Sequence, residues 1–205
     1  MGYKKNVFVN CPFDEGYKPL LRAMIFAVVK LGFEPKLSET RDGAVVRMDG
    51  ILELIRSSQF GIHDLSRCEA MQEGEFPRFN MPFELGLDLG AREFATSQKF
   101  KTKKILVLEE QRYRYQKVLS DLSGCDIYCH GGEAEQIIRE LRKWFAHHLG
   151  YKNVESGGEI WEKYNEFQSE AYSILLENGF DAKDLLNMAA SEYIMQVKNW
   201  LKDQN

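Results

Sequence analysis

The chain has 205 residues, and because 44% of them are hydrophobic it can bury a core, which excludes a mainly disordered protein. Asp and Glu outnumber Lys and Arg by 31 to 27, and the net charge of -4 argues against direct nucleic-acid binding through a broad basic face. No run approaches the ~20 apolar residues that span a bilayer, and no signal-peptide core follows the N-terminus. We therefore expect a cytoplasmic protein that makes no membrane contact and has free thiols at its four cysteines.

Strand and helix patterns alternate over the first 150 residues. Short apolar runs bounded by turn residues predict strands, in chain order, at 6–10, 33–38, 60–64, 105–108 and 125–129. Helical spacing of apolar residues predicts helices at 17–31, 48–57, 80–94, 113–122 and 133–148. Asn80 is a favoured N-cap and Pro82 is tolerated in a first turn, so the third helix is expected to open there. This alternation predicts an α/β fold, a three-layer flavodoxin-like or Rossmann-like structure with a parallel five-stranded sheet.

The last part of the chain has no strand pattern. A linker with Gly, Ser and Asn spans 150–158, and helical periodicity follows at 159–178 and 181–202, with Gly179 between the two segments. We therefore divide the chain into an α/β domain over 1–150 and a C-terminal helical hairpin over 151–205. The apolar side chains of the hairpin either mediate assembly into a homo-oligomer or pack onto the α/β domain.

Ligands of open parallel sheets bind at the carboxyl ends of the strands, so the loops after the strands hold the candidate site. Arg41 and Arg78 either offer guanidinium forks to phosphate oxygens or are solvated surface charges. Asp64 ends the third strand and either binds a ribose hydroxyl or caps the loop at Ser66. The candidate substrate-binding residues at this edge are Asn10, Pro12, Phe13, Asp14, Arg41, Asp64, Ser66, Arg78 and Asn80.

Familiar cofactor and metal patterns are missing from the sequence. No G-x-G-x-x-G follows the first strand and no G-x-x-x-x-G-K-[ST] occurs, so the dehydrogenase and ATPase hypotheses lose their main support. Cys125, Cys129 and His130 match no standard zinc spacing, and Cys125 is expected to be a small buried hydrophobic residue. We predict neither a bound metal nor a resident cofactor.

Glu84 is the candidate catalytic residue. It is expected in the first turn of the helix that opens at Asn80, where the helix dipole favours an ionised carboxylate. Its apolar neighbours Phe83 and Leu85 oppose ionisation. A carboxylate held in this way either stabilises an oxocarbenium-like transition state or attacks an anomeric carbon. The alternative is that Glu84 only complements the helix dipole.

Four short motifs occur in one order, namely Val7-Phe-Val9, Pro12-Phe13, Ile62-His-Asp-Leu-Ser66 and Phe83-Glu-Leu-Gly86. In this order they resemble the TIR-like and nucleoside 2-deoxyribosyltransferase-like proteins, over residues 6 to about 148. The segment from Arg78 to Gly90 is also similar to a bacterial TIR-like family. The glutamate at the position of Glu84 is catalytic in TIR NAD glycohydrolases and is the nucleophile in the transferases.

The resemblance implies an N-glycosyl bond hydrolase that acts on NAD or a related nucleotide, with NAD as substrate rather than cofactor. It also implies an effector role in bacterial antiviral defence, where assembly often activates TIR enzymes. Asp64 and Ser66 would then hold the ribose, and residues of the first loop would face the phosphates. Two alternatives stay open: a nucleoside 2-deoxyribosyltransferase-like enzyme, and a non-enzymatic nucleotide-sensing or scaffold module. The transferases carry Asp, Gly and Thr where this chain has Arg78, Asn80 and Met81.

Overall fold

The structure is a computed structural model that describes residues 2–38, 47–70, 73–150 and 154–204. It divides into two compact units. The sheet unit comprises residues 1–18 and 34–133, and the helical unit comprises residues 19–33 and 134–205. The boundary near residue 150 that the sequence predicts is a different division, and it stays a prediction. No helix in the described part of the chain is both long and apolar enough to span a bilayer.

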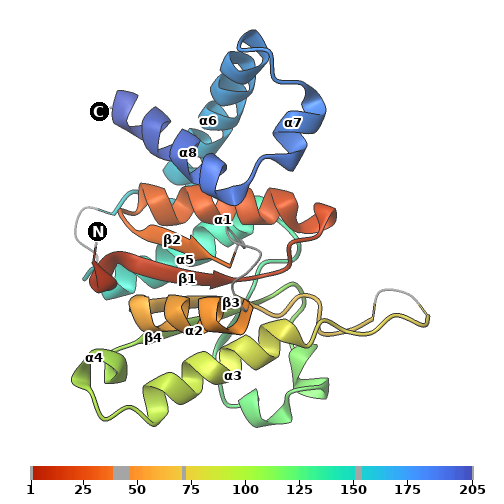
Figure 1. The fold of residues 1–205 in the computed structure, drawn as a ribbon, viewed down its shortest axis with the longest axis vertical. Helices are drawn as coiled ribbons and strands as arrows, with labels where there is room; N and C mark the ends of the chain where they lie inside the picture. Colours follow the sequence, from red (N-terminus) through yellow and green to blue (C-terminus); the bar gives the residue numbers. More distant parts are fainter. Residues whose placement is uncertain (1, 39–46, 71–72, 151–153, 205) are drawn as a thin grey trace. The chain divides into compact units, whose positions relative to one another are not determined.

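A five-stranded parallel sheet forms the centre of the sheet unit (Figure 1), as the alternating pattern predicts. The strands run in the order β2-β1-β3-β4-β5, which is the flavodoxin-like order. Pairing is parallel throughout, with Val7 of β1 opposite Pro35 of β2 and Phe60 of β3. The strands are β1 (Asn6–Asn10), β2 (Glu34–Leu37), β3 (Phe60–Asp64), β4 (Lys104–Glu109) and β5 (Ile127–Cys129).

Helices α2 (Arg47–Ser57) and α3 (Asn80–Glu93) pack against β1 and against each other, and α3 also contacts β3. Phe8 of β1 is buried in one core cluster with Ile51 and Ile55 of α2. Burial of such side chains stabilises the unit by roughly 1.5–3 kcal/mol each. The short helix α4 (Gln98–Lys101) precedes β4 and is capped by Ser97, and the sequence analysis did not predict it.

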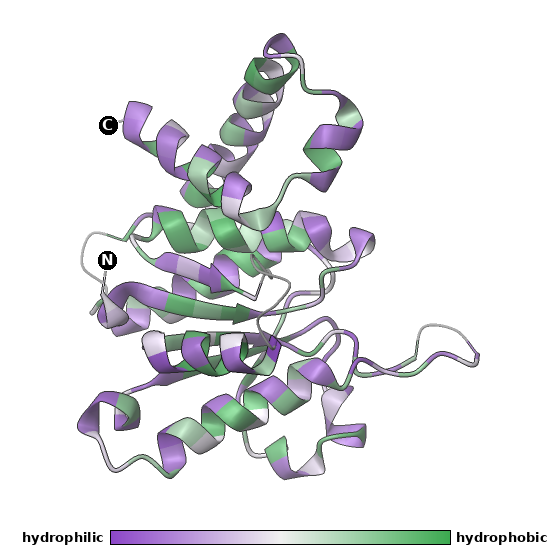
Figure 2. Cartoon of the chain, viewed as in Figure 1, coloured by the Kyte–Doolittle hydropathy of each residue, from purple (hydrophilic) through white to green (hydrophobic). Residues whose placement is uncertain are grey.

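The helical unit contains α1 (Lys18–Lys30), α5 (Ala134–His148), α6 (Gly157–Glu177), α7 (Ala182–Asn187) and α8 (Ala190–Asp203). Much of α1 is hydrophobic (Figure 2), and its residue Phe26 is stacked on Phe167 with ring centroids 5.5 Å apart. Trp200 of α8 lies against the same two rings. A capping box of Ser156 and Glu159 begins α6, because each side chain accepts a hydrogen bond from the backbone of the other residue.

Four sequence predictions are wrong in detail. The helix expected at 113–122 is two 3-10 turns, Tyr115–Lys117 and Ser120–Leu122, because Leu119 between them has non-helical dihedral angles. The helix expected at 181–202 is broken, because Met188 and Ala189 are extended. Asn80 is the first residue of α3 and does not cap it; the cap position is Phe79, with no side-chain cap bond. The fourth error is Cys125, which is exposed rather than buried, and all four cysteines are free thiols.

Candidate functional site

Buried polar residues mark the carboxyl ends of four strands in the sheet unit. Asn10 ends β1, Asp64 ends β3, Glu109 ends β4 and His130 follows β5. All four side chains are buried. In a sheet of this order the switch point lies between β1 and β3, where open α/β sheets bind ligands. The polar residues therefore lie at the edge where the sequence places the site.

Asp64 accepts hydrogen bonds from four donor groups. Its Oδ1 accepts from the Ser66 backbone amide at 2.8 Å and from the Ser66 hydroxyl. Its Oδ2 accepts from the Tyr17 hydroxyl and lies 3.0 Å from Nε2 of His130. The bond to the Ser66 amide closes the turn after β3, as expected of an aspartate that caps this loop. Asp64 is fully buried, so this geometry favours the capping alternative over direct contact with a ribose hydroxyl.

His130 donates a hydrogen bond to this cluster. Its Nδ1 accepts a hydrogen bond from the Gly132 amide at 3.1 Å, which assigns the proton of the neutral ring to Nε2. Nε2 lies 3.0 Å from Ser66 Oγ and 3.0 Å from Asp64 Oδ2. A ring held in this tautomer cannot take the Ser66 proton, so the three residues do not form a Ser-His-Asp nucleophile. The sequence analysis missed this role; a histidine directly after the fifth predicted strand was the available signal.

The Asp64 carboxylate is held in its ionised form. Burial by itself raises its pKa, but hydrogen bonds from His130, Ser66 and Tyr17 outweigh burial and lower the pKa below the ordinary value. Burial and the nearby charge of Asp64 raise the pKa of Tyr17 well above its ordinary value, so its hydroxyl stays protonated and donates. The negative charge of Asp64 is therefore stabilised by hydrogen bonds from within the protein.

A second ion pair fixes the neighbouring loop. Arg114 donates from Nε to Glu109 at 3.1 Å and from its terminal nitrogen to the Ser66 carbonyl at 2.8 Å. The Glu109 carboxylate also accepts from the Glu110 amide at 2.8 Å. Burial disfavours the charge of Arg114, but the hydrogen bond to Glu109 reverses that effect and raises its pKa. The two sides of the Ser66 turn are thus held by Asp64 and by Arg114.

A buried polar chain connects the interior with the N-terminal end of α3. Lys103 lies 3.0 Å from Asp88, and Asp88 lies 3.1 Å from Nε2 of His63. The Asn10 amide nitrogen lies 3.0 Å from Nδ1 of His63 and donates to the Met81 carbonyl at 2.9 Å. His63, Asp88 and Lys103 have no exposed side-chain surface. This chain explains why Asn10 is buried: its amide is used to hold α3, not to face solvent.

Glu84 is buried on α3 without such partners. Its residue is only 4% exposed. Among the residues that the structure describes, none donates a hydrogen bond to its carboxylate; the charge of Arg47 acts on it from α2. Burial raises the pKa of Glu84, and Arg47 opposes the shift only in part. The prediction that Glu84 lies in the first turn is wrong, because α3 begins at Asn80 and its first turn holds no acidic residue.

The Cys11 thiol is within electrostatic range of three carboxylates. Burial raises the pKa of its thiol, and the negative charges of Asp64, Glu84 and Asp14 raise it further. Glu84 and Asp64 therefore act electrostatically on one buried thiol just after β1. The sequence predicts that both acids lie at this edge, and both are within electrostatic range of the Cys11 thiol.

Charged residues form the rim of this edge. Asp14 caps the 3-10 turn Glu15–Tyr17 by accepting from the Tyr17 amide at 3.1 Å. Arg67 lies 3.4 Å from Asp14, and Arg78 lies 3.9 Å from it. Arg78 is half-exposed, whereas Arg67 is mostly buried. Asp14 and Arg78 are two of the predicted substrate-binding residues.

The remaining predicted residues differ in their exposure. Pro12 is buried, and Phe13 and Asn80 are exposed. Arg41 lies outside the described residues. Phe79 and Phe83, one helical turn apart at the beginning of α3, are both more than half exposed. Exposed aromatic rings next to Glu84 are available to stack on a planar group.

The comparisons with known proteins add no relative. No family model matches the chain, and no curated protein is similar enough in sequence to be counted as related to it. Among the described residues, no group of three or more His, Cys, Asp or Glu side chains is arranged to hold a metal ion. The chemistry of the site therefore has to be argued from its own residues.

Proposed function

We propose that the carboxyl edge of the sheet binds a nucleotide and that Glu84 acts in breaking its N-glycosyl bond, with NAD or a related nucleotide as substrate. One observation carries the proposal. Glu84 is a buried carboxylate that accepts no hydrogen bond from the described residues, whereas the buried acids Asp64, Asp88 and Glu109 each accept a hydrogen bond or form an ion pair. A buried carboxylate that accepts no hydrogen bond from the described residues, at a ligand-binding edge, is a feature of functional sites.

The reaction needs a negative group close to a sugar that becomes positive. The bond between the ribose anomeric carbon and the nicotinamide nitrogen breaks, and its electron pair leaves with the neutral base. The ionised Glu84 carboxylate stabilises the ribosyl cation, and a water oxygen then bonds to the anomeric carbon and releases a proton to solvent. Asp64 takes no direct part; with His130 it holds the Ser66 turn in place, as a positioning residue.

The charged rim supplies a place for phosphate. Arg67 and Arg78 both lie close to Asp14, at 3.4 Å and 3.9 Å. The arrangement supports a role in which the half-exposed Arg78 turns from Asp14 to a phosphate oxygen when a nucleotide binds. Guanidinium groups suit phosphate because their fork matches two oxygens at once.

The first test is base release, measured by chromatography. Wild type and Glu84→Gln are incubated with NAD and with a panel of nucleosides, each at low and at high protein concentration. We expect nicotinamide release by wild type and a loss of at least about 100-fold in Glu84→Gln, the scale on which removal of one transition-state charge group is felt. Because burial raises the pKa of Glu84, activity should fall on acidification at a pH above 4.5, the ordinary value for glutamate.

The matched control is Glu93→Gln, an exposed glutamate on the same helix. It should keep wild-type activity. Equal activity in wild type and Glu84→Gln would remove Glu84 from the chemistry. Exchange of bases between two nucleosides would assign the site to the deoxyribosyltransferase class instead. Nucleotide binding without turnover, with the same affinity in Glu84→Gln, would support a sensing module.

A further inference from the structure

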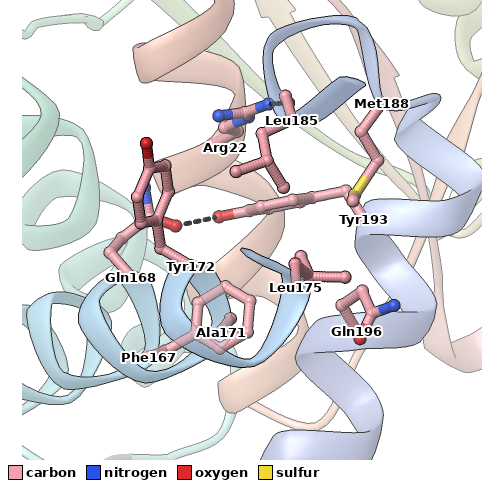
Figure 3. A pocket seen from close by; sticks show the side chains of 10 residues that line it. All are labelled: Arg22, Phe167, Gln168, Ala171, Tyr172, Leu175, Leu185, Met188, Tyr193 and Gln196. Atoms are coloured by element: carbon pink, nitrogen blue, oxygen red, sulfur yellow. Dashed lines mark hydrogen bonds between the residues drawn. The ribbon is translucent and has the colours of Figure 1, made fainter. Parts of the chain in front are cut away.

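The helical unit contains a pocket that the proposed function does not use. It is lined by α6, α7 and α8 together with Arg22 of α1 (Figure 3), and all of these residues belong to the helical unit. Its volume is about 400 Å³, the open mouth included.

The pocket has a positive charge without a counter-charge. Arg22 is the single charged residue among those that line it. Its guanidinium donates to the Leu185 carbonyl and lies 5.3 Å from the ring centroid of Tyr193. Within the described part of the chain, no Asp or Glu side chain forms an ion pair with Arg22. A partly buried cation in this situation favours an anionic ligand, because the ligand restores the interactions that water supplies elsewhere.

A hydrogen bond between two side chains also lies in the pocket wall. The Tyr193 hydroxyl donates to Oε1 of Gln168 at 3.0 Å, the dashed line in Figure 3. This bond directs the Gln168 amide so that its NH₂ group is the free end. Burial raises the pKa of Tyr193 well above its ordinary value, so this residue brings no negative charge.

The walls of the pocket contain aromatic rings and a polarizable thioether. Phe167, Tyr172 and Tyr193 present rings, and Met188 presents a thioether (Figure 3). Tyr172 is about half exposed, at 48%, so the mouth of the pocket has an aromatic side that solvent reaches. Planar rings and a thioether bind an aromatic group well, through stacking and sulfur contacts.

From these observations we propose that the pocket between α6, α7 and α8 binds a small aromatic carboxylate, with Arg22 paired to the carboxylate and the ring held by Phe167, Tyr172 and Tyr193. The site is separate from the Glu84 edge and does not depend on the function proposed for that edge. The proposed ligand would be bound by residues of the helical unit alone.

Binding is tested on the full chain with three probes of similar shape and different charge. These are phenylacetate, neutral phenylacetamide and cationic phenethylamine, titrated by calorimetry and by ligand-observed NMR. We expect phenylacetate to bind with a Kd of about 1 mM or tighter, as a ligand of this size can. Phenylacetamide should bind at least about tenfold more weakly, because a charge-assisted hydrogen bond is lost. Phenethylamine should not bind.

Variants locate the binding. Arg22→Met keeps the apolar stem and removes the charge, and it should weaken phenylacetate binding at least about tenfold. Ala171→Leu places a larger side chain in the pocket, leaves every polar group in place, and should also abolish binding. Arg142→Met is the matched control, because Arg142 also donates to backbone carbonyls, those of Val154 and Glu155, but does not line the pocket.

The outcomes separate clearly. Phenylacetate binding that is lost in Arg22→Met and Ala171→Leu but kept in Arg142→Met and Glu84→Gln supports the site. The proposal would be overturned by equal binding of all three probes, or by binding that survives both pocket variants. It would also be overturned if wild type bound no phenylacetate up to a concentration of about 10 mM. Thermal unfolding of each variant shows that a loss of binding is not a loss of folding.

Discussion

Asp64 and Glu84 are both buried carboxylates of the sheet unit, and both act on the Cys11 thiol, yet their environments differ. Asp64 accepts from four donor groups and its pKa is lowered. Glu84 accepts from no described donor and its pKa is raised. The difference shows that burial alone does not decide ionisation: donors do. Two acids whose pKa values are pushed apart are a pattern found in active sites, where environment sets the role of each acid.

The largest expected effect in this comparison is on stability, from Asp64→Asn. The substitution puts an NH₂ group where the carboxylate faces donors from Tyr17 and His130, and it leaves at least one donor unpaired. We expect the free energy of unfolding to fall by about 3–5 kcal/mol, as when one member of a buried charged network is removed. Chemical denaturation followed by circular dichroism measures it.

The pH dependence of stability sharpens the same prediction. The lowered pKa of folded Asp64 means that its contribution is complete above its unfolded value, near 3.8, and is lost as the pH falls through the folded value. Wild type should therefore lose more stability on acidification below pH 3.8 than Asp64→Asn does. Asp126→Asn is the control, an exposed aspartate just before β5, and should change stability by less than about 0.5 kcal/mol. A small effect of Asp64→Asn would show that the network is not intact in solution.

Local patterns predicted the sheet but not the partners within the site. The short apolar runs of β1, β3 and β4 are local signals, and their parallel pairing follows from the alternation with helices, so the sheet could be predicted. Asp64 and Glu84 were found because each lies near the end of an element. Tyr17 and His130 are 47 and 66 positions away from Asp64, and no local pattern encodes such a contact.

The errors in the sequence analysis have physical causes of the same kind. The helix expected at 113–122 does not form, and Arg114 in this segment donates hydrogen bonds to Glu109 and to the Ser66 carbonyl. The periodicity of the sequence cannot reveal such tertiary contacts. The break between α7 and α8 depends on two extended residues, Met188 and Ala189, and neither is a residue type that marks a break in sequence. Pattern reasoning thus succeeds for elements and fails where a distant side chain decides the backbone.

A smaller effect is expected from Tyr17→Phe, which removes one of the four donors of Asp64 and leaves the ring in place. The free energy of unfolding should fall by about 1.5–3 kcal/mol, the usual contribution of a hydrogen bond to a charged group. Differential scanning calorimetry measures it. Tyr113→Phe serves as the control, because Tyr113 is 68% exposed. If the two variants have equal stability, the Tyr17 hydroxyl contributes nothing to Asp64.

The smallest effect should have the opposite sign. Glu84→Gln removes a buried charge that Arg47 compensates only in part, so we expect the free energy of unfolding to rise, by up to about 1 kcal/mol. The sign follows from the raised pKa: between the unfolded value of 4.5 and the folded value, the native state binds more protons, so wild-type stability falls as the pH rises. The advantage of Glu84→Gln should therefore be largest at neutral pH and disappear below pH 4.5.

Thermal unfolding of wild type, Glu84→Gln and Glu93→Gln between acid and neutral pH measures this difference. Only Glu84→Gln should gain stability, because Glu93 is exposed and paired with Arg92. A variant that is more stable and inactive would show that the protein keeps an unfavourable charge for the sake of its chemistry. A variant that loses stability at neutral pH would mean that Glu84 has a stabilising partner, and the contrast with Asp64 would then fail.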